Sequence, residues 1–128
     1  MKIQSIVSSD LPETEKQFLA LMSSHADWFV RSKGDFDQLI SSPENPIPGV
    51  PKDAVDAFKE TLEFKNGGLA NARYDVLTPH LSEDEVRDLF KHFGISKIYF
   101  EEHKDMKCGQ HTCVQNSFTI CTGNCFHG

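Results

Sequence analysis

The chain has 128 residues, 38% of them apolar, and a formal net charge of −6 at neutral pH. This length suits one domain with a modest hydrophobic core, and the lack of any Lys/Arg block argues against a nucleic-acid partner. No apolar run is long enough to span a membrane, and the N-terminal segment lacks the apolar stretch of a signal peptide, so we expect synthesis in the cytoplasm. In that reducing compartment, clustered cysteines are more often metal ligands or reactive thiols than disulfides.

Three amphipathic helices are predicted in the first half of the chain. The first covers residues 12–31, with a break near 23–24, because apolar residues recur there at helical spacing. The second covers residues 35–41 and the third residues 53–64. Between them, residues 43–51 contain four prolines, which cannot continue a helix and favour an extended connector.

Two more helices are predicted next. The Asn-Gly-Gly sequence at residues 66–68 is interpreted as a left-handed cap that ends the third helix, and residues 69–77 as a further short helix. Ser82 and Glu85 have the spacing of a capping box at the start of the last helix. The apolar stripe of that helix consists of Val86, Leu89, Phe90 and Phe93.

The composition changes at residue 103. Residues 95–102 are rich in β-type side chains and predict one short strand or hairpin. Residues 103–128 hold all four cysteines and few aliphatic residues, so we expect a flexible tail. We therefore predict a mostly α fold: an acidic helical domain of four or five helices over residues 1–102, and a separate Cys-rich tail over residues 103–128.

Thiols and hydroxyl groups alternate along this tail. Dehydration of a Ser or Thr gives an alkene conjugated to a carbonyl group, to which a nearby cysteine thiolate can add to form a thioether ring. The short gaps between these residue types favour such rings, and Gly and Asn permit the tight turns. The residues predicted to be modified are Cys108, Thr112, Cys113, Ser117, Thr119, Cys121, Thr122 and Cys125.

Two other interpretations of the tail remain open. The cysteines have the spacing Cys-x4-Cys and Cys-x3-Cys and could bind zinc or copper, although zinc sites mostly use Cys-x2-Cys. Alternatively, residues 95–102 and 117–121 form a hairpin stapled by two disulfides. The candidate metal ligands are Cys108, Cys113, Cys121, Cys125 and His111, with His103 and His127 as further donors.

This layout resembles precursors of ribosomally synthesised, post-translationally modified peptides, in particular lanthipeptide precursors with long folded leaders. The resemblance implies that residues 1–102 are a leader recognised by enzymes that modify cysteine, Ser or Thr. It also implies that a peptidase-exporter releases the modified tail as a secreted, antibacterial peptide. The double glycine Gly67-Gly68 looks like the cleavage signal of such leaders but lies forty residues before Cys108. The residues expected to support leader recognition are Val86, Leu89, Phe90 and Phe93.

The sequence contains no motif of a catalytic site. A Gly-rich phosphate loop, a Gly-x-Ser-x-Gly nucleophile and a His-Glu-x-x-His zinc motif are all missing. Cys113 beside His111 could form a nucleophile pair, but the surrounding tail offers no rigid frame. We therefore expect no enzyme activity, no catalytic residue and, in the precursor interpretation, no cofactor.

Overall fold

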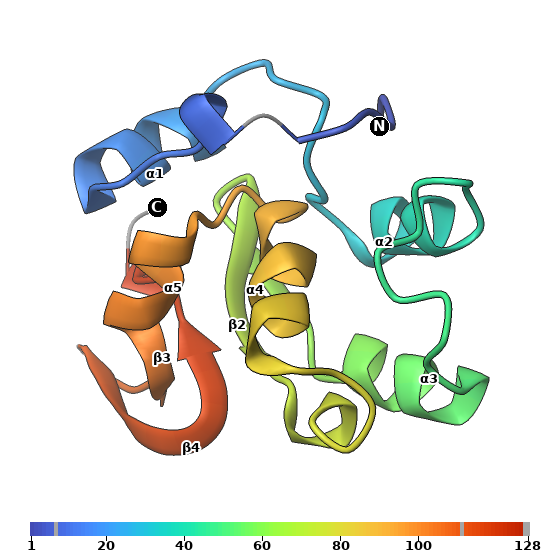
Figure 1. Cartoon of the computed structure of the whole chain (residues 1–128). Helices are drawn as coiled ribbons and strands as arrows, with labels where there is room; N and C mark the ends of the chain where they lie inside the picture. The colour runs from blue at the N-terminus through green and yellow to red at the C-terminus, as the bar shows by residue number, and fades with distance from the viewer. Residues whose placement is uncertain (7, 111, 127–128) are drawn as a thin grey trace.

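The computed structural model describes residues 1–6, 8–110 and 112–126. Within these ranges the chain forms five α-helices and one four-stranded antiparallel sheet (Figure 1). The fold is therefore mixed α/β, and the prediction of a mostly α fold with a flexible tail is wrong. The helices are α1 (Glu15–Met22), α2 (Lys33–Ile40), α3 (Lys52–Glu60), α4 (Glu83–Lys91) and α5 (Lys97–His103). The strands are β1 (Glu63–Lys65), β2 (Gly68–Arg73), β3 (Lys104–Cys108) and β4 (Cys113–Cys121), and the 3-10 turns are η1 (Ser8–Asp10), η2 (Asp75–Leu77) and η3 (Asn124–Phe126).

The helices begin where side chains cap their first turns. α4 starts at the predicted capping box, in which Ser82 Oγ accepts from the Glu85 amide and the Glu85 carboxylate accepts from the Ser82 amide. α1 has a second capping box, formed by Thr14 and Gln17. The first helix ends at Ser23, which confirms the predicted break but makes the predicted extension to residue 31 wrong.

Residues 63–73 form a hairpin, and within residues 69–77 only the 3-10 turn η2 is helical. Asn66 and Gly67 occupy the turn between β1 and β2 with φ values of 53° and 92°. Two consecutive positive φ angles match the twist of paired strands, which is why Asn-Gly favours tight hairpins. The predicted helical cap and the helix at 69–77 are therefore wrong, because the chain reverses into β2.

The segment predicted as a strand, residues 95–102, is mostly helix α5. Ser96 caps it, since its Oγ accepts a hydrogen bond from the Tyr99 amide at 3.1 Å. Tyr99 is fully buried and stacks on Phe18 of α1, with ring centroids 4.7 Å apart. Capping and the burial of this ring outweigh the weak preference of its residues for a strand.

The sheet has the order β1-β2-β4-β3, so the C-terminal strand β4 lies between β2 and β3. Lys104 pairs with Ile120, and Met106 pairs with Gln115. An interval of two residues on β3 is therefore matched by an interval of five residues on β4. This wide bulge lets β4 curl, as Figure 1 shows. The predicted flexible tail is wrong because β4 pairs with both neighbours and buries Ile120 in the core.

Helices α2 and α3 and the end of α4 contribute aromatic rings to the hydrophobic core. Phe36 of α2, Phe58 of α3 and Phe93, just after α4, pack with ring centroids 5.7 to 6.5 Å apart. The four side chains predicted to support leader recognition are all part of this core: Val86, Leu89, Phe90 and Phe93. In the described ranges, no helix has both the length and the apolar character needed to cross a membrane.

Candidate functional site: a four-cysteine cluster

Three segments of the C-terminal region bring the four cysteines together. Cys108 ends β3, Cys113 and Cys121 are the first and last residues of β4, and Cys125 lies in η3. The curl of β4 makes this possible: Cα atoms of Cys113 and Cys121 are 5.8 Å apart. In a straight strand, eight steps of about 3.3 Å would separate them by about 26 Å.

The structure pairs the cysteines as two disulfides, Cys108–Cys125 and Cys113–Cys121. The corresponding Cα separations of 6.5 and 5.8 Å lie in the usual range for such bridges. The two pairs are also in contact, because Cys121 Sγ lies 3.8 Å from Cys108 Sγ and 4.0 Å from Cys125 Sγ. The sulfur atoms of Cys108, Cys121 and Cys125 therefore all lie within 4.8 Å of one another, and Cys113 adjoins this group through its bridge to Cys121.

Hydrogen bonds from β2 fix the β3 side of the cluster. The amide of Cys108 donates to Asn71 Oδ1 at 2.9 Å, and Cys108 Sγ lies 3.5 Å from the Ala70 carbonyl oxygen. Cys108 and Cys113 are also direct partners in the β3–β4 register. The tip of this hairpin is thus folded back against β2.

A second set of hydrogen bonds fixes the chain on the C-terminal side of β4. Thr122 Oγ1 donates to the Leu69 carbonyl at 2.8 Å, and the Asn66 side-chain amide donates to the Asn124 carbonyl at 2.7 Å. The Tyr99 hydroxyl donates to the Thr122 carbonyl at 2.6 Å, and burial raises the pKa of this phenol, which keeps it protonated. The β1–β2 hairpin and α5 together position Cys125 beside the other sulfur atoms.

The hydroxyl residues predicted to be modified differ in accessibility. Thr112 and Ser117 are exposed, whereas Thr119 and Thr122 are buried and donate hydrogen bonds. A dehydratase would reach the buried pair only after this part of the sheet opened. The remaining predicted ligand, His111, lies outside the described residues, as does His127.

The cluster has the donor chemistry of a soft metal site. In tetrahedral zinc–thiolate centres the Zn–S distance is about 2.3 Å, which places neighbouring sulfur atoms about 3.8 Å apart. The distances of 3.8 and 4.0 Å from Cys121 Sγ to Cys108 Sγ and Cys125 Sγ agree with that spacing, whereas the two bonded pairs, Cys108–Cys125 and Cys113–Cys121, would have to separate to bind a metal ion. Cys121 is fully buried and the other three cysteines are half-buried, so a metal ion or an oxidant can reach the cluster.

The sequence predicted the four cysteines but missed the residues that hold them. Asn71 and Asn66 act through contacts with segments distant in the chain, and Thr122, which was predicted only as a modified residue, does the same. The Asn66-Gly67 dipeptide was the available signal, since it marks a hairpin whose second strand lies beside the cluster. A scan against protein-family models, a search of curated proteins and a search of solved structures found no match.

Proposed function

We propose that the chain is a small metal- and redox-binding thiol protein that uses its four cysteines as one centre. In the reduced state, Cys108, Cys113, Cys121 and Cys125 bind one thiophilic metal ion. In the oxidised state, the same cysteines close into two disulfides. The observation that carries this proposal is the contact between the two cysteine pairs, at 3.8 and 4.0 Å, which separate structural disulfides do not need.

Zinc is the metal that this donor set favours. Four thiolates in a tetrahedral arrangement are typical of structural zinc sites, and thiolate ligands also select copper(I). The strands and η3 provide the ligands from both ends of β4, so the metal would hold the same curl that the disulfides hold. Metal binding would therefore stabilise the fold of the hairpin.

Conversion of four thiolates into two disulfides forms two S–S bonds and releases four electrons. Two molecules of hydrogen peroxide accept these electrons with four protons and become four molecules of water, and the metal ion leaves. Conversely, a dithiol reductant would open both disulfides and restore the thiolates.

Metal titration of the reduced protein tests this proposal. We expect one zinc ion per chain, measured against a chromophoric chelator, and a cobalt(II) derivative with the bands of a tetrahedral thiolate site. Cys125→Ser should weaken zinc binding about 100-fold, since a four-ligand site of 10–16 kcal/mol assigns about 3 kcal/mol to each ligand. Ser117→Ala, an exposed neighbour, is the matched control and should leave affinity unchanged.

The same protein distinguishes this function from that of a peptide precursor. Hydrogen peroxide should release the zinc and lower the mass by four hydrogens. Co-expression with a lanthipeptide synthetase should leave all four hydroxyl residues unmodified. Removal of water from Thr112, Ser117, Thr119 or Thr122, together with no zinc binding, would overturn the proposal and favour the precursor.

A further inference from the structure

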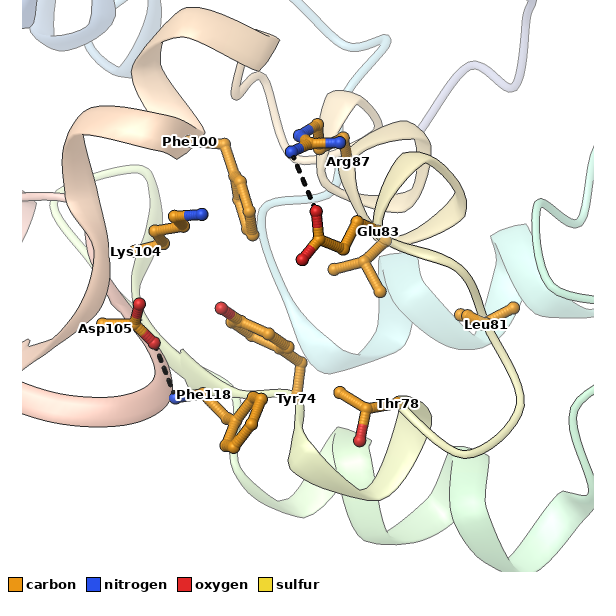
Figure 2. A pocket seen from close by; sticks show the side chains of 10 residues that line it. Tyr74, Thr78, Leu81, Glu83, Arg87, Phe100, Lys104, Asp105 and Phe118 are labelled. Carbon is orange, nitrogen blue, oxygen red and sulfur yellow. Dashed lines mark hydrogen bonds and ion pairs between the residues drawn. The ribbon is translucent and has the colours of Figure 1, made fainter.

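A second candidate site lies beside the hairpin bulge, and its lining includes Asp105 and Phe118 of the two paired strands. It is a cavity of about 240 Å³ between α4, the start of β3 and the bulge of β4 (Figure 2). Three aromatic rings line it: Tyr74, Phe100 and Phe118. The Tyr74 ring stands perpendicular to Phe118, with centroids 6.2 Å apart, and tilted by 48° to Phe100 at 5.7 Å. The rings thus form differently oriented walls of one small space.

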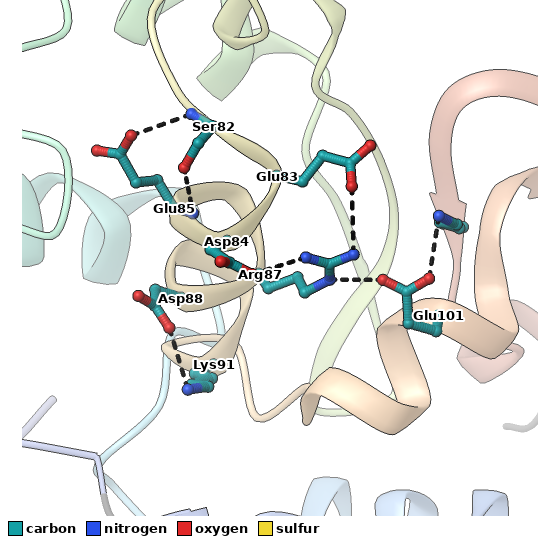
Figure 3. A network of polar contacts seen from close by, with 9 residues as sticks. Ser82, Glu83, Asp84, Glu85, Arg87, Asp88, Lys91 and Glu101 are labelled. Carbon is teal, nitrogen blue, oxygen red and sulfur yellow. Dashed lines mark hydrogen bonds and ion pairs between the residues drawn. The ribbon is translucent and has the colours of Figure 1, made fainter.

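Two carboxylates, Glu83 and Asp105, and two cations, Arg87 and Lys104, line this cavity. Arg87 is bound by Glu83, Asp84 and Glu101 (Figure 3). Lys104 contacts Glu101 at 3.0 Å. Asp84 and Glu101 lie outside the lining and pair with these two cations, so the four carboxylates of the whole network exceed its cations by two charges.

The pKa of Tyr74 agrees with this charge balance. It is raised to about 12, first by burial and then by the carboxylates of Asp105, Glu101 and Glu83. The phenol therefore stays neutral, because burial and the three nearby carboxylates both disfavour its anion.

The bulge holds one wall of the cavity in an unusual conformation. Phe118 and Asp105 both have positive φ values, 56° and 58°, and the Phe118 amide donates to Asp105 Oδ1 at 3.0 Å. A bulky residue rarely adopts this left-handed conformation, and strained backbone of this kind is concentrated at binding sites. The conformation keeps the Phe118 side chain 47% exposed beside the cavity, where burial alone gives no reason for an aromatic ring.

We propose that this cavity binds a small organic cation of the alkylammonium class. Aromatic faces attract a cation through their quadrupole, and several rings around one space are the usual way to recognise a quaternary ammonium group. The surplus of carboxylates adds charge complementarity. Lys104 also reaches the cavity, but Glu101 holds its ammonium group, so it competes with a ligand only weakly.

The test is an NMR titration of the full chain with choline and with its neutral carbon isostere, 3,3-dimethylbutan-1-ol. We expect choline to bind more tightly and to shift the resonances of Tyr74, Phe100 and Phe118. Phe118→Gly keeps the left-handed backbone and the amide donor but removes one ring, and should weaken choline binding about 10-fold. Glu60→Gln, an exposed acid on α3, is the control and should change nothing.

Two charge variants provide a test that does not depend on the ring. Asp105→Asn retains an oxygen acceptor and tolerates positive φ, so it removes only charge and should weaken choline binding a few-fold. Lys104→Gln should strengthen it a few-fold. Equal binding of choline and its neutral isostere, tighter binding of acetate, or full affinity in Phe118→Gly would overturn the proposal.

Discussion

The aromatic core formed by α2, α3 and α4 differs from the C-terminal hairpin in how far its side chains are buried. In the core, Phe36, Phe58, Phe90 and Phe93 are fully buried against one another. In the hairpin, the described residues from 104 to 118 are exposed or half-buried, and only the end of β4, Thr119 to Cys121, is buried. The core can be stabilised by apolar burial alone, whereas the hairpin depends on the cysteine cluster and a few hydrogen bonds. We therefore predict that its stability depends on whether the two disulfides are closed.

The largest effect is expected from a cavity in the aromatic core. Phe93→Ala removes a fully buried ring that packs against Phe36, Phe58 and Phe64. We expect a loss of about 3–5 kcal/mol in the free energy of unfolding, measured by urea denaturation. Ile98→Ala, an exposed position on α5, is the control and should cost under about 0.5 kcal/mol. Equal losses in the two variants would contradict the location of the core.

Reduction of the disulfides without metal should have a smaller and more local effect. Cys108–Cys125 spans 17 residues and Cys113–Cys121 spans 8, so the first bridge should contribute about 3 kcal/mol and the second slightly less. Amide hydrogen exchange should show lost protection in β3 and β4 and retained protection in α2, α3 and α4. Loss of protection throughout the chain would show that the two regions are not stabilised separately.

The smallest effect is expected at a helix cap. Ser82→Ala removes the hydroxyl that accepts from the Glu85 amide, and should cost about 1 kcal/mol in thermal or urea unfolding. The change should leave zinc affinity untouched, because α4 provides no cysteine. Ser117→Ala serves again as a control, with no measurable loss of stability expected. A weakened metal site in Ser82→Ala would mean that the cluster depends on the helical region.

The helical region could be predicted from the sequence, and the C-terminal hairpin could not. The capping box of Ser82 and Glu85 and the stripe of α4 depend on residues three or four apart, and the helix is where the pattern indicated. The hairpin could not be predicted from local patterns. β4 is positioned by pairing with β2, whose Asn71 lies fifty residues from its partner Cys121, and a composition poor in aliphatic residues indicated disorder.

Only part of the candidate site was predicted, because its residues also come from segments that are distant in the chain. The four cysteines were recognisable from their density, but their spacing does not match a zinc knuckle. The cluster depends on the bulge at Asp105 and Phe118, which curls β4 and brings Cys113 to Cys121. No local motif marks such a bulge. The cavity lined by Tyr74 and Phe118 went unrecognised because its walls also come from distant segments.

X-ray absorption at the zinc edge of the reduced, zinc-loaded protein tests the central claim most directly. If the four cysteines form one metal centre, the spectrum should fit four sulfur ligands at about 2.3 Å. Cys113→Ser, which removes the ligand at the start of β4, should replace one sulfur with a lighter ligand at about 2.0–2.2 Å. A native spectrum with two sulfur ligands or fewer, the remainder being nitrogen or oxygen, would contradict the claim that the curl of β4 assembles a tetrathiolate site.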